Sequence, residues 1–84
     1  MYKYRVVRGE VDEGLVVLQD YRGQTYLVRP LSLAPPHGAK LDGARPHLGF
    51  GILVCSLSGQ MYRVIFEEIG GQRVVQPNQQ LRTG

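Results

Sequence analysis

The basic side chains are the residues whose type and spacing could do chemistry. Eight of the ten Lys and Arg residues are arginine, which binds phosphate and carboxylate through paired hydrogen bonds where lysine offers a point charge. Lys3, Arg5, Arg29 and Arg63 lie in segments with strand-like alternation, on the side opposite the large apolar residues. In a closed sheet, these four side chains could form an arginine-rich outer stripe.

A basic stripe on a small barrel is typical of nucleic-acid binding, because guanidinium groups neutralise phosphates and exposed tyrosines can stack on bases. The alternative is a solvated face with scattered charge. The net charge of +3 and the pI near 9.4 favour an acidic partner only mildly, since seven acidic residues are interspersed.

A second group of candidate contact residues lies in or beside a proline-rich segment, namely His37, Lys40, Arg45 and His47. The two histidines could bind a metal only as neutral imidazoles. Asp42 lies between them, but two histidines without a cysteine or carboxylate cluster make a poor site. We therefore predict surface histidines and neither metal nor cofactor.

The common catalytic motifs are absent from the sequence. The only cysteine, Cys55, lies in an apolar strand and is predicted to be a small buried hydrophobe and not a nucleophile. One cysteine also excludes an intrachain disulfide framework, which suits a reducing compartment. Because the chain has no Gly-x-Gly-x-x-Gly, phosphate-loop or Gly-x-Ser-x-Gly motif, the sequence predicts a noncatalytic protein.

The elements that must position these side chains are strands. Period-two alternation and glycine-containing turns recur along the chain, and no segment has helical periodicity. The expected strands span residues 2–8, 15–18, 24–29, 52–55, 60–69 and 72–76, with pairing from Gly49. The inward side chains are predicted to be Tyr2, Tyr4, Val6, Tyr26, Val28, Tyr62, Val64 and Phe66.

Residues 30–46 interrupt this pattern, because Pro30, Pro35, Pro36 and Pro46 with Gly38 and Gly43 disfavour both a helix and a paired central strand. We predict one long loop there. Residues 48–76 are expected to form a β-meander. The whole is a single β domain over residues 1–77 with a C-terminal tail over residues 78–84, and its fold is all-β: a five- to six-stranded barrel or a strongly curved antiparallel sheet.

Two segments resemble a known class of modules. They are HLGFGILV at residues 47–54 and YRVIFEEIGGQRVV at residues 62–75, followed by Leu81. They are similar to the Tudor-like, Src-homology-3-like barrels of UvrD-family helicase C-termini and of CarD-type RNA polymerase interaction domains, although Leu53 stands where those modules have a second glycine. The resemblance implies docking onto nucleic acid, RNA polymerase or a helicase-type protein, without catalysis.

A second resemblance implies an enzyme. Gln60-Met61-Tyr62, with Val64 and Glu68-Ile69 after it, is similar to the Gln-Ile-Tyr motif of type II dihydrofolate reductases, which are tetrameric barrels around a shared pore. It implies that Gln60 and Tyr62 line such a pore and that the protein oxidises NADPH with dihydrofolate. The chain shows no counterpart of that family's basic pore residue.

The remaining expectations concern partners and location. Open strand edges favour a homodimer or strand addition by a partner, so a protein adaptor is an alternative function. Lys3, Arg5 and Arg8 interrupt the apolar residues near the N-terminus, and no stretch approaches the roughly 20 apolar residues of a membrane span. We therefore expect a cytoplasmic protein without membrane contact.

Overall fold

The computed structural model describes residues 1–9, 14–70, 72 and 73. Strands are the only extended elements in this part of the chain, and none of its residues forms a helix long and apolar enough to cross a membrane. The strands are β1 (Tyr2–Arg8), β2 (Val16–Asp20), β3 (Thr25–Pro30), β4 (Lys40–Gly43), β5 (Gly49–Cys55), β6 (Met61–Ile69) and β7 (Gln72–Arg73).

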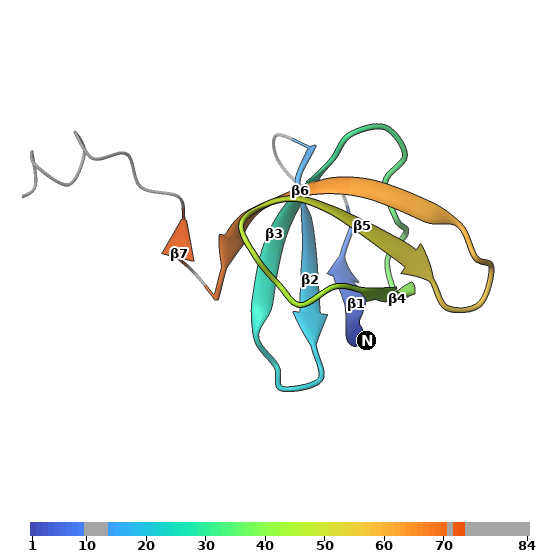
Figure 1. Cartoon of the computed structure of the whole chain (residues 1–84), viewed down its shortest axis with the longest axis horizontal. Coiled ribbons are helices and arrows are strands. Elements are labelled where there is room, and N and C mark those ends of the chain that lie inside the picture. The colour runs from blue at the N-terminus through green and yellow to red at the C-terminus, as the bar shows by residue number, and fades with distance from the viewer. Residues whose placement is uncertain (10–13, 71, 74–84) are drawn as a thin grey trace, which may run out of the picture.

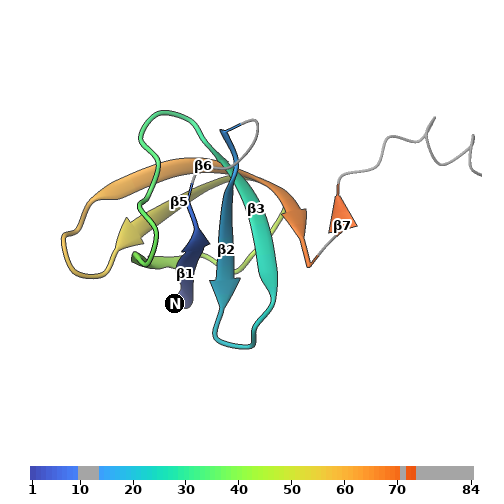
Figure 2. The same ribbon diagram turned by 180° about the vertical axis from the view of Figure 1, so that it is seen from behind.

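The strands close into an antiparallel barrel. Their order is β3-β2-β1-β4-β5-β6, and a further pairing between β3 and β6 joins the two ends, so that six strands form the barrel while β7 pairs with the end of β6. Figures 1 and 2 show the long, curved strand β6, which lies between β5 and β3 and closes the barrel. The all-β barrel predicted from the sequence is confirmed.

The core lies inside this barrel and contains the residues expected from alternation. Tyr62, Val64 and Phe66 on β6 are all buried, as are Tyr4 and Val6 on β1 and Tyr26 and Val28 on β3. Tyr2, also predicted to point inward, is only partly buried and packs against the edge of this core. The aromatic rings meet edge to face, with ring centroids 5.5 Å apart for Tyr4 and Tyr26 and 6.0 Å apart for Tyr26 and Phe66. Such pairs add about 0.5–1.5 kcal/mol each beyond the burial of apolar area.

The prediction of one uninterrupted loop over residues 30–46 is wrong. The structure places β4 in its second half, where it is a central strand that pairs with both β1 and β5. Leu41 supplies the driving force because its side chain is fully buried in the core. Gly43 lets the strands approach closely: a Cβ there would lie 2.7 Å from Leu53 Cδ2 and 3.2 Å from the Ile52 carbonyl oxygen.

The meander predicted for residues 48–76 is confirmed as far as the structure describes it. β5, β6 and β7 pair in chain order. The turn before β6 contains Gly59 at φ 79° and the turn after it contains Gly70 at φ 56°, a region that favours glycine. Residues 74–77 of the predicted domain and the predicted tail over 78–84 lie outside the described residues.

Candidate nucleic-acid interface

The four basic residues predicted to form one stripe are divided between two sides of the barrel. Lys3 and Arg5 lie on β1, whereas Arg29 and Arg63 lie on β3 and β6. In the closed order of strands, β1 and β6 are three strands apart in either direction. The fold therefore brings each pair together and keeps the two pairs apart.

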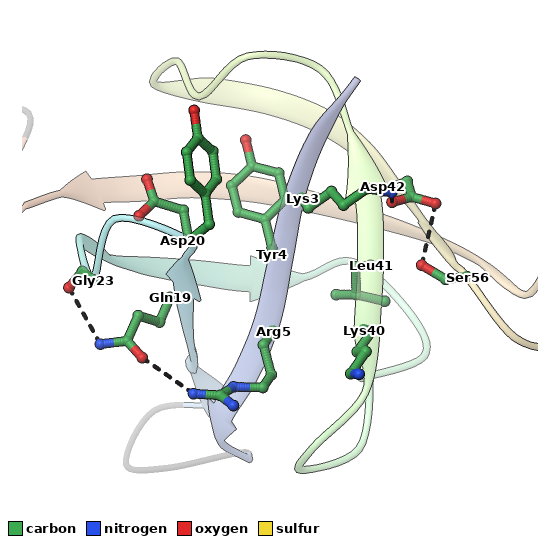
Figure 3. A pocket seen from close by; sticks show the side chains of 11 residues that line it. Lys3, Tyr4, Arg5, Gln19, Asp20, Gly23, Lys40, Leu41, Asp42 and Ser56 are labelled. Carbon is green, nitrogen blue, oxygen red and sulfur yellow. Dashed lines mark hydrogen bonds and ion pairs between the residues drawn. The ribbon is translucent and has the colours of Figure 1, made fainter.

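Lys40 joins the pair on β1. This residue was expected in a loop, but β4 carries it, and the pairing of β1 with β4 places Arg5 opposite Lys40 and Lys3 opposite Asp42. The outward side chains of β2, β1 and β4 border a hollow of about 580 Å³, which we call the basic groove. Figure 3 shows Arg5 and Lys40 at the same level on neighbouring strands, with Gln19 of β2 on the other side of Arg5.

One of the three cations in the basic groove has a carboxylate partner. Lys3 Nζ lies 2.9 Å from Asp42 Oδ1, and the Ser56 hydroxyl donates a hydrogen bond of 3.1 Å to Asp42 Oδ2. The hydrogen bond from Lys3, followed by that from Ser56, holds the pKa of Asp42 below its ordinary value. The positive charge of Lys3 is thus partly neutralised by the Asp42 carboxylate.

Arg5 and Lys40 have no such partner. The described part of the chain contains no carboxylate that forms an ion pair with either side chain, and Arg5 is held only by a long hydrogen bond of 3.5 Å from Nη2 to Gln19 Oε1. Like charges directly opposite each other on paired strands destabilise a sheet. An anion bound between Arg5 and Lys40 would relieve this repulsion.

Tyr21 stands at one end of the basic groove, a position that the sequence reasoning did not single out. It is 70% exposed at the tip of the β2–β3 hairpin, with its ring centroid 5.7 Å from that of Tyr2. Arg22 Cζ lies 5.5 Å from the centre of the Tyr21 ring, a cation–π distance. An exposed aromatic residue at a hairpin tip is the signal that could have found it.

A second hollow, of about 610 Å³, begins on the other side of this hairpin tip. Tyr21 borders both hollows, and the second is also lined by Tyr2, Arg22 and Arg45. Arg45, one of the predicted loop contacts, is therefore placed on the same aromatic and basic surface as Tyr21. The two hollows thus meet at Tyr21.

A buried carboxylate fixes the hairpin that carries Tyr21. Asp20 Oδ1 accepts hydrogen bonds from the backbone N–H groups of Arg22 and Gln24, at 2.8 and 3.0 Å. Asp20 Oδ2 accepts from the hydroxyls of Tyr26 and Tyr2, at 2.6 and 3.0 Å. Burial alone acts to raise the pKa of Asp20, but these four hydrogen bonds favour the charged form, and the net shift is downward.

The two histidines lie far apart in the fold. His37 is exposed in the turn before β4, where the N–H of Gly38 donates to the Val6 carbonyl at 2.8 Å. His47 follows β4 at the other end, stacked on Phe66 with ring centroids 6.2 Å apart. Within the described ranges, no three His, Cys, Asp or Glu side chains are grouped so that they could hold a metal ion.

Both ring nitrogens of His47, in the short loop between β4 and β5, lie within hydrogen-bond distance of backbone carbonyl oxygens. Nδ1 lies 3.1 Å from the Arg45 carbonyl oxygen and Nε2 lies 2.9 Å from the Phe50 carbonyl oxygen. Both partners are acceptors, so only the doubly protonated ring donates to both. These hydrogen bonds, the one to Arg45 first, raise the pKa of His47.

The remaining residues singled out from the sequence are placed as follows. Arg29 forms an ion pair with Glu67 on the outer side of β3 and β6. Cys55 was predicted to be buried, but it is half-buried, and hydrogen bonds from the side chain and backbone of Ser58 and from the backbone of Leu57 lower the pKa of its thiol. Cys55 is the last residue of β5 and packs against the edge of the core, so its burial is only partial.

The two residues that the reductase resemblance assigns to a pore lie in different environments. Tyr62 is buried in the barrel core, and Gln60 is exposed in the turn before β6, where its Nε2 donates to the Met61 carbonyl at 2.9 Å. Only Gln60 is thus on the surface.

Comparisons of this chain with family models, with curated proteins and with solved structures find no match.

Proposed function

We propose that this chain is a noncatalytic binding module that contacts nucleic acid through the basic groove. One observation carries the proposal: Arg5 and Lys40 face the same hollow from paired strands and have no ion-pair partner in the described part of the chain. Phosphate groups would supply the missing negative charge, and Lys3 would contribute a third cation. Arg29 and Arg63, also expected at this interface from the sequence, are not part of the proposed contact surface.

Tyr21 favours a single strand over a duplex as the ligand. A base in a single strand can stack on an exposed aromatic ring, whereas bases within a duplex are already stacked on one another. Tyr21 offers such a ring at the end of the cationic groove, and the nearby guanidinium of Arg22 adds positive charge. The module is thus expected to bind the backbone on β1 and β4 and a base at the β2–β3 hairpin.

The closed antiparallel barrel of six strands supports a finer assignment to the Src-homology-3-like or Tudor-like barrels. Under this assignment, a complex that processes nucleic acid is the natural setting for the module. Fold alone does not specify function. The proposal of nucleic-acid binding therefore rests on the basic groove and not on the barrel fold.

The experiment is a titration of the protein into a short fluorescently labelled oligothymidine and into a DNA duplex of equal length, at several salt concentrations. Each phosphate contact to a single strand contributes a slope of about −0.7 in log K against log salt. Contacts from Lys3, Arg5 and Lys40 therefore predict a slope of about −2. Titrations that stay flat at low salt would remove the proposal.

Single substitutions then locate the interface. Arg5→Ala and Lys40→Ala should each weaken binding and reduce the salt slope by about 0.7, and Tyr21→Ala should weaken single-strand binding by about 5- to 150-fold, or about 1–3 kcal/mol. Arg63→Ala is the matched control because it removes the same charge from the opposite side of the barrel. Equal weakening by Arg5→Ala and Arg63→Ala would mean that only net charge matters.

A further inference from the structure

The outer side of β5 and β6 carries an exposed apolar surface. Core residues alternate with outward residues along both strands, and the register pairs Phe50 with Ile65, Ile52 with Arg63 and Val54 with Met61. Phe50 is 50% exposed, Ile52 43% and Met61 52%. Clustered exposed apolar side chains of this kind mark interaction sites more often than scattered ones do.

Leu31 extends this surface toward β3. Its backbone N–H donates to the Arg63 carbonyl at 2.9 Å, which brings it alongside the middle of β6, and the residue is 50% exposed. We call this surface the apolar face and define it by its outward residues, which are Leu31, Phe50, Ile52, Met61, Arg63 and Ile65. It lies on the side of the barrel opposite the basic groove.

Arg63 is the charged residue at the centre of the apolar face. Ile52 lies opposite it on β5, and Met61 and Ile65 flank it on β6. In the part of the chain that the structure describes, Arg63 has no ion-pair partner, and the nearest acid on the same side of β6, Glu67, is already paired with Arg29. A guanidinium bordered by apolar side chains binds a carboxylate more strongly than one in open water, because a docked partner excludes solvent from the pair.

We propose that the apolar face docks a protein segment in which an Asp or Glu side chain is flanked by aliphatic or aromatic residues. The carboxylate would pair with Arg63 while its neighbours cover Ile52, Phe50 and Met61. This arrangement matches the common anatomy of interfaces, in which an arginine and aromatic anchors at the centre supply most of the binding energy.

A second copy of the chain fits this face less well. Two copies related by a twofold axis through the face would bring their Arg63 side chains toward each other. The described acid nearest to them, Glu67, already neutralises Arg29. Such a dimer would bury like charges at its centre, whereas an acidic partner neutralises the single cation.

The test selects binders from a random dodecapeptide display library on the immobilised full chain. The proposal predicts that enriched peptides combine an acidic residue with at least two aliphatic or aromatic neighbours. A synthetic copy of the strongest peptide should lose about 30-fold in affinity with Arg63→Ala, since a central arginine typically contributes about 2 kcal/mol or more. Phe50→Ser should weaken it as well.

Matched variants and thermal unfolding separate docking from misfolding. Arg5→Ala removes the same charge from the basic groove and should leave peptide affinity unchanged, and all variants should unfold cooperatively near the parent. Peptides enriched without acidic residues, or an affinity insensitive to Arg63→Ala, would overturn the proposal. So would concentration-dependent dimerisation abolished by Ile52→Arg, or binding to phosphatidylserine vesicles lost with Arg63→Ala, because either result assigns the face to another occupant.

Discussion

The hydroxyl of Tyr26, inside the barrel, donates a hydrogen bond of 2.6 Å to the Oδ2 atom of Asp20 at the end of β2. Both side chains are buried, and the Asp20 carboxylate also binds the two backbone N–H groups that shape the β2–β3 hairpin. Burial, followed by the bond to Asp20, raises the pKa of Tyr26, so its proton stays on the hydroxyl. The barrel core and the hairpin that carries Tyr21 are therefore joined through one carboxylate.

The first prediction concerns this hydrogen bond. Tyr26→Phe removes the donor and leaves the ring packing intact, so it should lower the free energy of unfolding by about 1.5–3 kcal/mol, as expected for a hydrogen bond to a charged group. Tyr62→Phe is the matched control, because Tyr62 is also buried and its hydroxyl makes no hydrogen bond to the described residues. Equal unfolding midpoints for the two variants in urea would contradict the assignment.

The second prediction concerns acid stability. Because the pKa of Asp20 is lower in the folded protein than its ordinary value of 3.8, the charged carboxylate stabilises the fold above that value, and the contribution is lost as the pH falls through the folded pKa. Asp20→Asn should therefore destabilise the protein at neutral pH and have a flatter stability profile below about pH 4. Urea unfolding from pH 2 to 7 measures this, and parallel profiles for the two proteins would exclude Asp20 as the source.

The third prediction tests the close approach of β4 and β5. Gly43→Ala places a Cβ within 2.7 Å of Leu53 Cδ2 and 3.2 Å of the backbone oxygen of Ile52, so either the buried Leu53 side chain must move or the strands must shift apart. A destabilisation of about 1–3 kcal/mol is expected from such overpacking. Gly9→Ala is the control, since an added Cβ at Gly9 meets no atom within 4 Å. A Gly43→Ala protein as stable as Gly9→Ala would show that β4 and β5 accommodate a Cβ at this position without strain.

Gly43 also explains why part of the fold was predictable and part was not. The long strands β1 and β6 carry seven and nine residues, so their period-two alternation is visible locally and identifies Tyr62, Val64 and Phe66 as core. β4 has only four residues, and Leu41 is its one buried side chain. A strand this short shows no alternation of apolar and polar residues that could be recognised in the sequence. The glycine that indicated a loop is required by the close approach of Ile52 and Leu53 on the next strand, β5, which lies outside the segment itself.

The prediction of the candidate site from the sequence was limited for the same reason, because it depends on contacts between strands. Alternation places Lys3, Arg5, Arg29 and Arg63 on the outside of the sheet, and the structure agrees with that. Which of them are neighbours depends on strand order and register, and these join Arg5 with Lys40 across β1 and β4. Neither the division into two faces nor the position of Tyr21 beside the basic groove can be obtained from spacing within one strand.

The fourth prediction concerns His47 and the loop that leads into β5. Because its two ring nitrogens face the carbonyl oxygens of Arg45 and Phe50, the protonated ring is favoured, and its pKa should be found above 6.5 by NMR titration. A raised folded pKa means that the contribution to stability is complete below the unfolded pKa and is lost as the pH rises through the folded one. The loop amides of Leu48 to Phe50 should accordingly exchange with solvent faster, after correction for intrinsic exchange, above that pKa. His47→Gln should remove this pH dependence, because glutamine does not titrate, while a pKa at or below 6.5 would show that the ring does not donate to both carbonyls.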